Sequence, residues 1–194
     1  RQTCIRHSRH IDHFGGVRGV VTDEQVESGQ VRIIAPEHFL HEAVFENVIA
    51  GPAMGRRANY QFGMTLPAGP RQHVDSGLGK ATPMGQIGLI PPTEYITETG
   101  QEKTVDGIRI IFQLTPEAEA PAEMNFFFPE RGPEQADGSR KGWLCMAENC
   151  SHNMHNLLPL RGAQARDSLG WSKYINEALE LFGADSALTV SYTH

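Results

Sequence analysis

The stretch that decides the fold is residues 7–16, His-Ser-Arg-His-Ile-Asp-His-Phe-Gly-Gly. It places His7, His10, Asp12 and His13 within seven residues. Imidazole nitrogens and carboxylate oxygens are ligands that zinc accepts. Because Asp12 and His13 are adjacent, their side chains point opposite ways in an extended loop, which suits two neighbouring metal ions. We therefore predict a metal-binding loop, and the alternative is an ordinary histidine-rich surface loop.

Composition narrows the class of protein. The 194 residues suit one domain, and 39% hydrophobic with 21% charged residues is typical of a globular protein. A formal charge of −6 argues against a nucleic-acid partner. No apolar run approaches the length of a membrane span. The three cysteines contain no CxxC pair, so neither a disulfide framework nor a cysteine zinc site is expected.

The order of predicted elements indicates an α/β fold. Apolar patterns and flanking turn residues predict strands at residues 31–35, 105–114, 124–128, 143–147 and 187–191. The second of these opens with the hairpin signal Asp106-Gly107. Helical spacing predicts helices at residues 37–49, ended by Gly51-Pro52, and through most of 155–182. Long loops are expected at residues 63–86 and 130–142.

Two carboxylates lie at predicted strand ends. Glu123 comes just before a strand and Glu148 just after one. Sites are often built at the rim of a sheet, and an acid beside an apolar strand needs a partner. Each of them alone could equally be a solvated loop residue.

The segment that leads into the last predicted helix holds further candidates. Ser151 or a nearby Asn could cap that helix, and His152 and His155 could share a helical face, either as a metal pair or in packing. The planar guanidinium of Arg161 suits a sulfate, phosphate or carboxylate, and the alternative is a surface ion pair.

Four motifs carry a family resemblance. They are His-Ile-Asp-His-Phe-Gly-Gly, Ala-Pro-Ala-Glu-Met-Asn-Phe, Met-Ala-Glu-Asn and His-Asn-Leu-x-x-Leu-Arg-Gly-Ala-Gln, in this order. The chain resembles bacterial alkylsulfatases of the metallo-β-lactamase superfamily over nearly its whole length. The resemblance implies an αββα sandwich, incomplete at both ends, in which residues 1–194 form part of the catalytic domain. The helical dimerisation region and the sterol-carrier-like domain would lie outside this sequence, and the chain reads as an internal piece of a longer protein.

The resemblance implies two zinc ions. His7, His10 and Glu123 would hold one of them, and Glu148 would bridge the pair.

The second zinc ion would be held by Asp12, His13 and a histidine from a late strand. His194 stands nearest to that late position. Either it is the ligand, slightly displaced, or the end of the sequence is misread.

The implied reaction is hydrolysis of an alkyl sulfate ester, such as dodecyl sulfate, to an alcohol and sulfate by a metal-bound water. Asn156 and Arg161 match the family's contacts to the sulfate group. The resemblance also implies a homodimer for the intact parent, and it favours a periplasmic or secreted location.

One departure affects the site directly. The family pattern is His-x-His-x-Asp-His, whereas this sequence has an extra residue, Arg9, between His7 and His10. Either the loop bulges and returns His7 to the site, or Ser8 takes its place and a ligand is lost. A guanidinium next to two zinc ions is also electrostatically unfavourable.

Two other classes of function stay open. One is a different hydrolase of the same fold that acts on a lactam, thioester or phosphoester. The other is a degenerate, non-catalytic zinc-binding protein. Because strands of the sandwich would be missing, we also expect the chain alone to be poorly stable.

Overall fold

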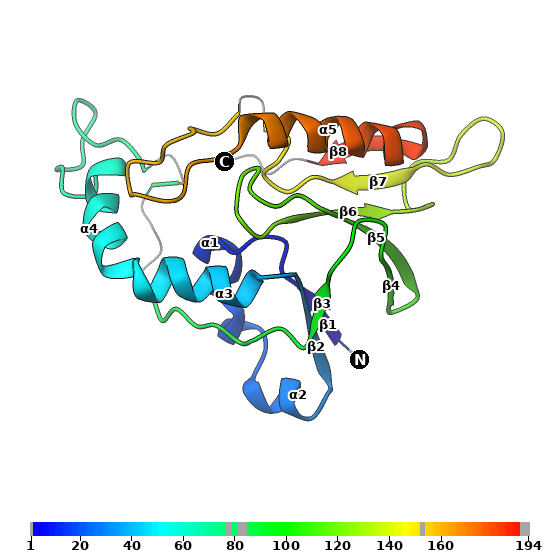
Figure 1. Ribbon diagram of the computed structural model, residues 1–194, viewed down its shortest axis with the longest axis horizontal. Coiled ribbons are helices and arrows are strands. Elements are labelled where there is room, and N and C mark those ends of the chain that lie inside the picture. The colour runs from blue at the N-terminus through cyan, green and yellow to red at the C-terminus, as the bar shows by residue number, and fades with distance from the viewer. Residues whose placement is uncertain (1, 77–78, 81–84, 152–153, 191–194) are drawn as a thin grey trace.

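The chain folds into two β-sheets that pack face to face, with helices on the two outer sides (Figure 1). The computed structural model describes residues 2–76, 79–80, 85–151 and 154–190. The first sheet is parallel and has the order β1 (Gln2–Ile5), β2 (Val31–Pro36), β3 (Glu94–Ile96). The second sheet follows chain order: β4 (Glu102–Val105), β5 (Ile108–Leu114), β6 (Met124–Phe128), β7 (Gly142–Cys145), β8 (Ser186–Val190). Its pairs are antiparallel except for the parallel pair β7–β8.

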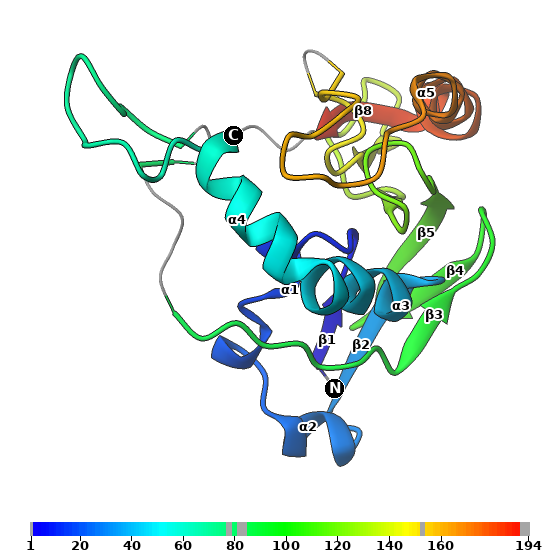
Figure 2. The ribbon, with the colours of Figure 1, turned by 60° about the vertical axis from the view of Figure 1, so that its left-hand side comes forward.

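The helices divide between the two outer faces. The described elements are α1 (Ile11–Phe14), α2 (Asp23–Glu27), α3 (Phe39–Val44), α4 (Gly51–Gln61) and α5 (Ser168–Phe182), with short helical turns η1 (Val17–Gly19), η2 (Phe45–Ile49) and η3 (Gly183–Asp185). Figure 2 shows α3 and α4 in front of β1 and β2, whereas α5 lies beside β8.

A buried apolar layer joins the sheets. Ile34 and Ile96 of the first sheet pack in one cluster with Ile110, Phe112 and Met124 of the second. Burying side chains of this size stabilises the sandwich by about 1.5–3 kcal/mol each. The αββα layering expected from the resemblance is therefore present.

Each outer face has a core of its own. Ala35 on β2 packs with Phe39 of α3, and Leu144 on β7 packs with Ala178 and Phe182 of α5. On β2, Ile34 packs in the cluster between the sheets, whereas Ile33 and Ala35 pack in two other buried clusters. Both faces of β2 are therefore covered, which explains why its sequence is a continuous apolar run.

Most strand predictions are confirmed. β2, β6 and β7 fall within or beside the predicted ranges, and β8 covers the last one up to Val190, with residue 191 outside the described residues. Asp106 and Gly107 have φ of 51° and 78°, so they form the expected tight turn between β4 and β5. The described residues of 63–86 contain neither helix nor strand, as expected.

The helix predicted at residues 37–49 is present as α3 followed by the π-helical turn η2, which ends at Ile49, but a further helix that was not predicted follows immediately. After α3 the chain passes through the π-helical turn η2, and α4 then begins at Gly51 with Pro52 in its first turn. A proline is tolerated there because the N–H groups of a first helical turn have no partner within the helix.

The last predicted helix is present and ends at Phe182 as expected, but its predicted start near residue 155 is wrong. α5 begins only at Ser168, where the side chain of Asp167 accepts a hydrogen bond from the Leu169 N–H (3.0 Å). Pro159 and Gly162, the latter with φ of 91°, lie in an irregular segment before it. Ser151 therefore caps no helix, and His155 lies in a loop.

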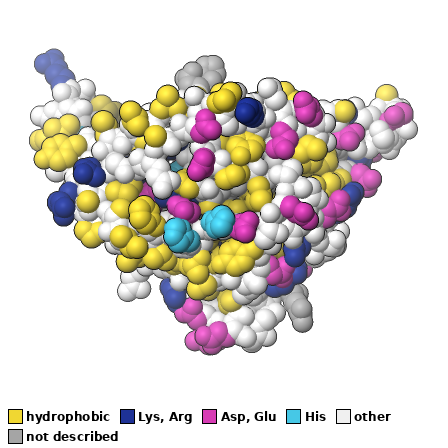
Figure 3. Space-filling model, viewed as in Figure 1, with side chains coloured by type: hydrophobic (Ala, Val, Ile, Leu, Met, Phe, Trp, Pro, Cys, Tyr) yellow, Lys and Arg dark blue, Asp and Glu magenta, His cyan; other side chains and the backbone are white. Residues whose placement is uncertain are grey.

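Large apolar side chains are exposed in several places. On η2, α4 and the loop that follows β7 they include Val48, Ile49, Tyr60, Leu157, Leu158 and Leu160, and on α5 they include Leu169, Leu179 and Leu181. The face shown in Figure 3 carries hydrophobic side chains among its charged ones. Low stability of the isolated chain stays a prediction.

Candidate metal centre

Two backbone hydrogen bonds fix the histidine loop at the rim of the sandwich. The Met124 N–H donates to the His7 carbonyl (2.9 Å), and the Arg9 N–H donates to the Ala122 carbonyl (3.2 Å). Ser8 thereby pairs with Glu123 in an antiparallel bridge. The loop that carries the histidines is held directly against the segment that carries the acid.

A buried polar network places Glu148 at the same rim. Asn149 is fully buried, and its side-chain amide donates to Thr115 Oγ1 (2.9 Å) and Asn125 Oδ1 (3.0 Å). Asn125 in turn donates to Gln113 Oε1 (2.8 Å). Because these groups cannot reach water, their mutual bonds lock the turn after β7 onto β5 and β6.

His10, His13 and Glu148 form the first cluster of potential ligands. His13 Nε2 lies 2.8 Å and His10 Nδ1 lies 3.6 Å from Glu148 Oε2. One ligand atom from each of the three residues lies within 4.8 Å of the others. The arrangement can accept a small cation between one carboxylate and two imidazoles.

Glu119, Glu123 and Glu148 form the second cluster, again with ligand atoms within 4.8 Å of one another. Glu123 is 1% exposed, and burial followed by repulsion from Glu119 and Glu148 raises its pKa well above the usual value. Its Oε2 accepts the Ala120 N–H (3.2 Å), whereas its buried Oε1 has no hydrogen-bond partner among the described residues. Three buried acids with an unsatisfied oxygen fit a divalent cation, which would remove the repulsion.

Glu119 was missed in the sequence. Its Oε2 lies 3.1 Å from His10 Nδ1. Burial by itself would lower the pKa of His10, but hydrogen bonds and charge from Glu119 and Glu148 raise it to about 10 in the metal-free chain. The signal was the pair of acids four residues apart, Glu119-Ala-Pro-Ala-Glu123, in which the proline turns the chain between them.

The loop returns His7 to the cluster. The ring centroids of His7 and His13 are 4.4 Å apart. Burial, with repulsion from His13, lowers the pKa of His7 to about 4, so it is neutral at pH 7, as a metal ligand must be. Ser8 is fully buried and its Oγ accepts the His10 N–H (3.3 Å), which makes it a structural residue of the loop.

The other predicted ligands are less tightly gathered. The side chain of Asp12 is 47% exposed, and its Oδ2 lies 3.4 Å from His13 Nε2. His155, which the sequence grouped with His152, has its Nε2 3.9 Å from Glu148 Oε1. His152 and His194 lie outside the described residues.

Arg9 does not leave an uncompensated charge beside the histidines. It is 2% exposed and ion-paired with Glu46 of η2. Arg161 reaches the same carboxylate, with Nη2 3.3 Å from Glu46 Oε1, and lies 3.4 Å from His10 Nε2. One candidate sulfate-binding residue is thus adjacent to the histidine cluster.

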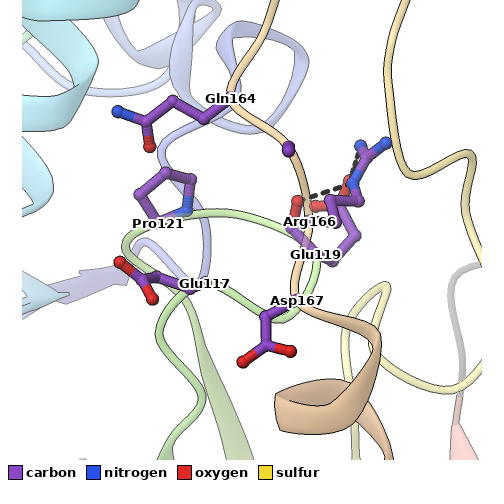
Figure 4. A pocket seen from close by; sticks show the side chains of 7 residues that line it. Glu117, Glu119, Pro121, Gln164, Arg166 and Asp167 are labelled. Atoms are coloured by element: carbon purple, nitrogen blue, oxygen red, sulfur yellow. Dashed lines mark hydrogen bonds and ion pairs between the residues drawn. The ribbon is translucent and has the colours of Figure 1, made fainter.

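The second candidate, Asn156, is held by a different arginine. Arg166 donates to the Asn156 carbonyl (2.7 Å) and to Asn156 Oδ1 (3.1 Å). The same guanidinium is ion-paired with Glu119 and donates from Nε to the Glu119 carbonyl (2.8 Å). Figure 4 shows Arg166 and Glu119 in the wall of a cavity of about 320 Å³ next to the cluster.

The two-sheet sandwich and the cluster at its rim define the class of protein: a chain with the metallo-β-lactamase type of fold. The metallo-β-lactamase MEM-A1, a subclass B3 enzyme from a soil metagenome library, superposes with a TM-score of 0.50 at 14% identity. The match covers 98% of this chain and 57% of that one, and it shows the fold alone. No protein-family model matches the chain.

Curated relatives are more specific. The alkyl/aryl-sulfatase BDS1 of Saccharomyces cerevisiae is 44% identical over 193 residues, 100% of this chain and 28% of that protein. A linear primary-alkylsulfatase of a Pseudomonas species is 46% identical over 185 residues, 95% of this chain and 26% of that protein. Among solved structures, the stereoselective inverting sec-alkylsulfatase Pisa1 from Pseudomonas sp. has a TM-score of 0.87 at 38% identity, covering 97% of this chain and 28% of that one.

By sequence and by fold, the chain resembles alkylsulfatases, and it spans about a quarter of the length of the relatives it matches. The resemblance stated from the motifs is confirmed. The relatives include bacterial alkylsulfatases and one from yeast. No helix in the described parts of the chain has the length and apolar character needed to cross a membrane.

Proposed function

We propose that this chain contributes the metal-binding half of an alkylsulfatase site, which hydrolyses alkyl sulfate esters to an alcohol and sulfate. The observation that carries the proposal is the contact of a cationic side chain, Arg161, with a buried cluster of histidines and acids. The similarity to named alkylsulfatases over 90% or more of the chain supports the substrate class.

We propose zinc as the metal, in two ions. Imidazole and carboxylate ligands suit zinc, and the described donors are His7, His10, His13, Glu119, Glu123 and Glu148, with Asp12 beside them. Bound zinc lowers the pKa of a coordinated water and polarises an ester oxygen.

Side chains of the protein would bind and orient the sulfate group of the substrate. Arg161 would pair with the sulfate oxygens and offset the negative charge that grows on the departing group. Asn156 would donate its side-chain amide to the same group, since Arg166 already occupies its carbonyl and Oδ1. In the net reaction one water molecule is consumed and the alcohol and hydrogen sulfate are released, with one hydrogen of the water ending on each product.

The test is sulfate release by the complete gene product that carries this sequence. We expect release from dodecyl sulfate, loss after chelation, and recovery with about two zinc ions per site. No release from primary or secondary alkyl sulfates by the zinc-loaded protein would refute the function. A stoichiometry of one would refute the two-ion arrangement and leave the substrate class standing.

A further inference from the structure

The residue that interrupts the metal-binding motif is built into the fold. Arg9 is 2% exposed, although a guanidinium is costly to bury without a partner. Its partner is Glu46, which is itself buried and comes from the π-helical turn η2. A π-helical turn inside a helical stretch is rare and is often found at functional sites.

Glu46 is shared with a second arginine. Arg161 Nη2 lies 3.3 Å from Glu46 Oε1, on the other oxygen from the one that Arg9 contacts. The backbone of Arg161 is fixed independently, because its N–H donates to Gln61 Oε1 of α4 (2.8 Å). Position and direction of the Arg161 side chain are therefore set by two neighbouring helical elements.

The charges of this triad do not cancel. Two guanidiniums share one carboxylate, so a positive charge is left over at the side of the cluster where Arg161 meets His10. Glu42 also acts on Arg9 through its field, but the carboxylate that both arginines contact is that of Glu46. If Arg9 were absent, Glu46 would pair with Arg161 alone and would neutralise the charge of that arginine.

We propose that Arg9 is a positioning residue for anion binding, which occupies Glu46 and so keeps the charge of Arg161 available to the sulfate group of the substrate. This inference rests on the proposed function, in which Arg161 contacts the sulfate. It assigns a role to the residue by which this sequence departs from the family pattern.

The first measurement is binding of inorganic sulfate to the zinc-loaded complete protein by calorimetry, with and without Arg9→Gln. Glutamine can still hydrogen-bond to Glu46 but carries no charge. Removing a unit charge at this range in a partly buried site should weaken sulfate binding about tenfold. KM for dodecyl sulfate should rise by a similar factor, while kcat changes less than about threefold. The matched control is Arg140→Gln, an exposed arginine in the loop 130–142, which should change neither.

A double-mutant cycle separates positioning from a general structural role. In an Arg161→Gln background, Arg9→Gln should weaken sulfate binding no more than about twofold, because the residue through which it acts is gone. A full tenfold loss in that background would overturn the proposal. So would unchanged sulfate binding in Arg9→Gln alone.

Arg9→Lys keeps the test decisive if Arg9→Gln does not fold. Lysine retains the charge, so sulfate binding should stay within about threefold of the original, and a tenfold loss would overturn the proposal. The sulfate measurement needs no turnover. A protein that binds sulfate as described but releases none from alkyl sulfates would refute the proposed function and leave the role of Arg9 intact.

Discussion

Replacing Glu123 by glutamine should change stability in opposite directions with and without metal. In the metal-free chain, Glu123 is buried beside Glu119 and Glu148, with ligand oxygens within 4.8 Å of one another. Two like charges at that distance repel by about 3.5 kcal/mol at an effective dielectric constant of about 20. Glutamine removes the charge but keeps the oxygen that accepts the Ala120 N–H.

The expected gain is smaller than the full repulsion, because protonation of Glu123 already relieves part of it. Its pKa is raised above the ordinary value of 4.5 by burial and by the two neighbouring acids. We expect Glu123→Gln to stabilise the metal-free chain by about 1–2 kcal/mol, which raises the melting temperature by about 4 °C for a chain of this size.

The pH dependence has a definite sign. A carboxyl whose pKa is raised on folding contributes stability that is complete below pH 4.5 and is lost as the pH rises through the folded-state pKa. In chelator, the gain from Glu123→Gln should therefore be small near pH 4 and grow as the pH rises. The buried His10 also titrates, but it does so in both the unsubstituted chain and the Glu123→Gln variant. The difference in stability between these two proteins therefore reports on Glu123.

With zinc the sign reverses. A metal at 100 times its dissociation constant stabilises a protein by about 2.7 kcal/mol, and a site that lacks one ligand loses much of that gain. The assay is thermal unfolding of both proteins in chelator and in zinc, with the exposed Glu180→Gln as the matched control. A lower melting temperature of Glu123→Gln in chelator, or an undiminished shift with zinc, would refute the assignment of the cluster.

Three further outcomes are expected. Arg166→Met should lower both zinc affinity and kcat/KM by about tenfold or more, measured by metal titration and steady-state kinetics, because one guanidinium holds Glu119 and Asn156. Phe112→Ala should destabilise the fold by about 3–5 kcal/mol in denaturant unfolding, because this fully buried ring fills the layer between the sheets. Asn149→Ala should lower the free energy of unfolding by about 1–3 kcal/mol and weaken zinc binding, since it leaves buried partners of the network unsatisfied. An unaltered metal affinity would show that the network does not place Glu148.

Local patterns predicted β2, β5, β6, β7 and β8, but they gave no indication of β1, β3 or β4, and they misplaced the start of α5. β2 and β6 are short apolar runs bounded by turn residues, so a few neighbouring residues are enough to predict them. The start of α5 could not be read from apolar spacing, because Leu157, Leu158 and Leu160 have helical spacing yet are exposed. The cap at Asp167 decides where the helix begins, and a capping residue is a single position that spacing does not reveal.

The candidate site was predictable from the histidine motif and from the two acids at strand ends, Glu123 and Glu148. His7, His10 and His13 are close in sequence, so the loop almost guarantees their proximity. Glu119 was not predicted, because its position at the cluster depends on Arg166, a residue 47 positions later in the chain. No short-range pattern connects the two.

The role of Arg9 could not be predicted from the sequence, because its partner Glu46 is distant along the chain. With only its sequence neighbours considered, a guanidinium among metal-binding histidines is unfavourable, and the sequence left open whether His7 returns to the site or is lost from it. The carboxylate that compensates it comes from Glu46, at a π-helical turn that periodicity did not predict. Once that partner is known, the extra residue is no longer an isolated charge: it leaves the adjacent Arg161 with a positive charge that an anionic ester can use. Whether an insertion damages a site or adapts it therefore depends on distant residues, and for this chain the buried triad favours adaptation.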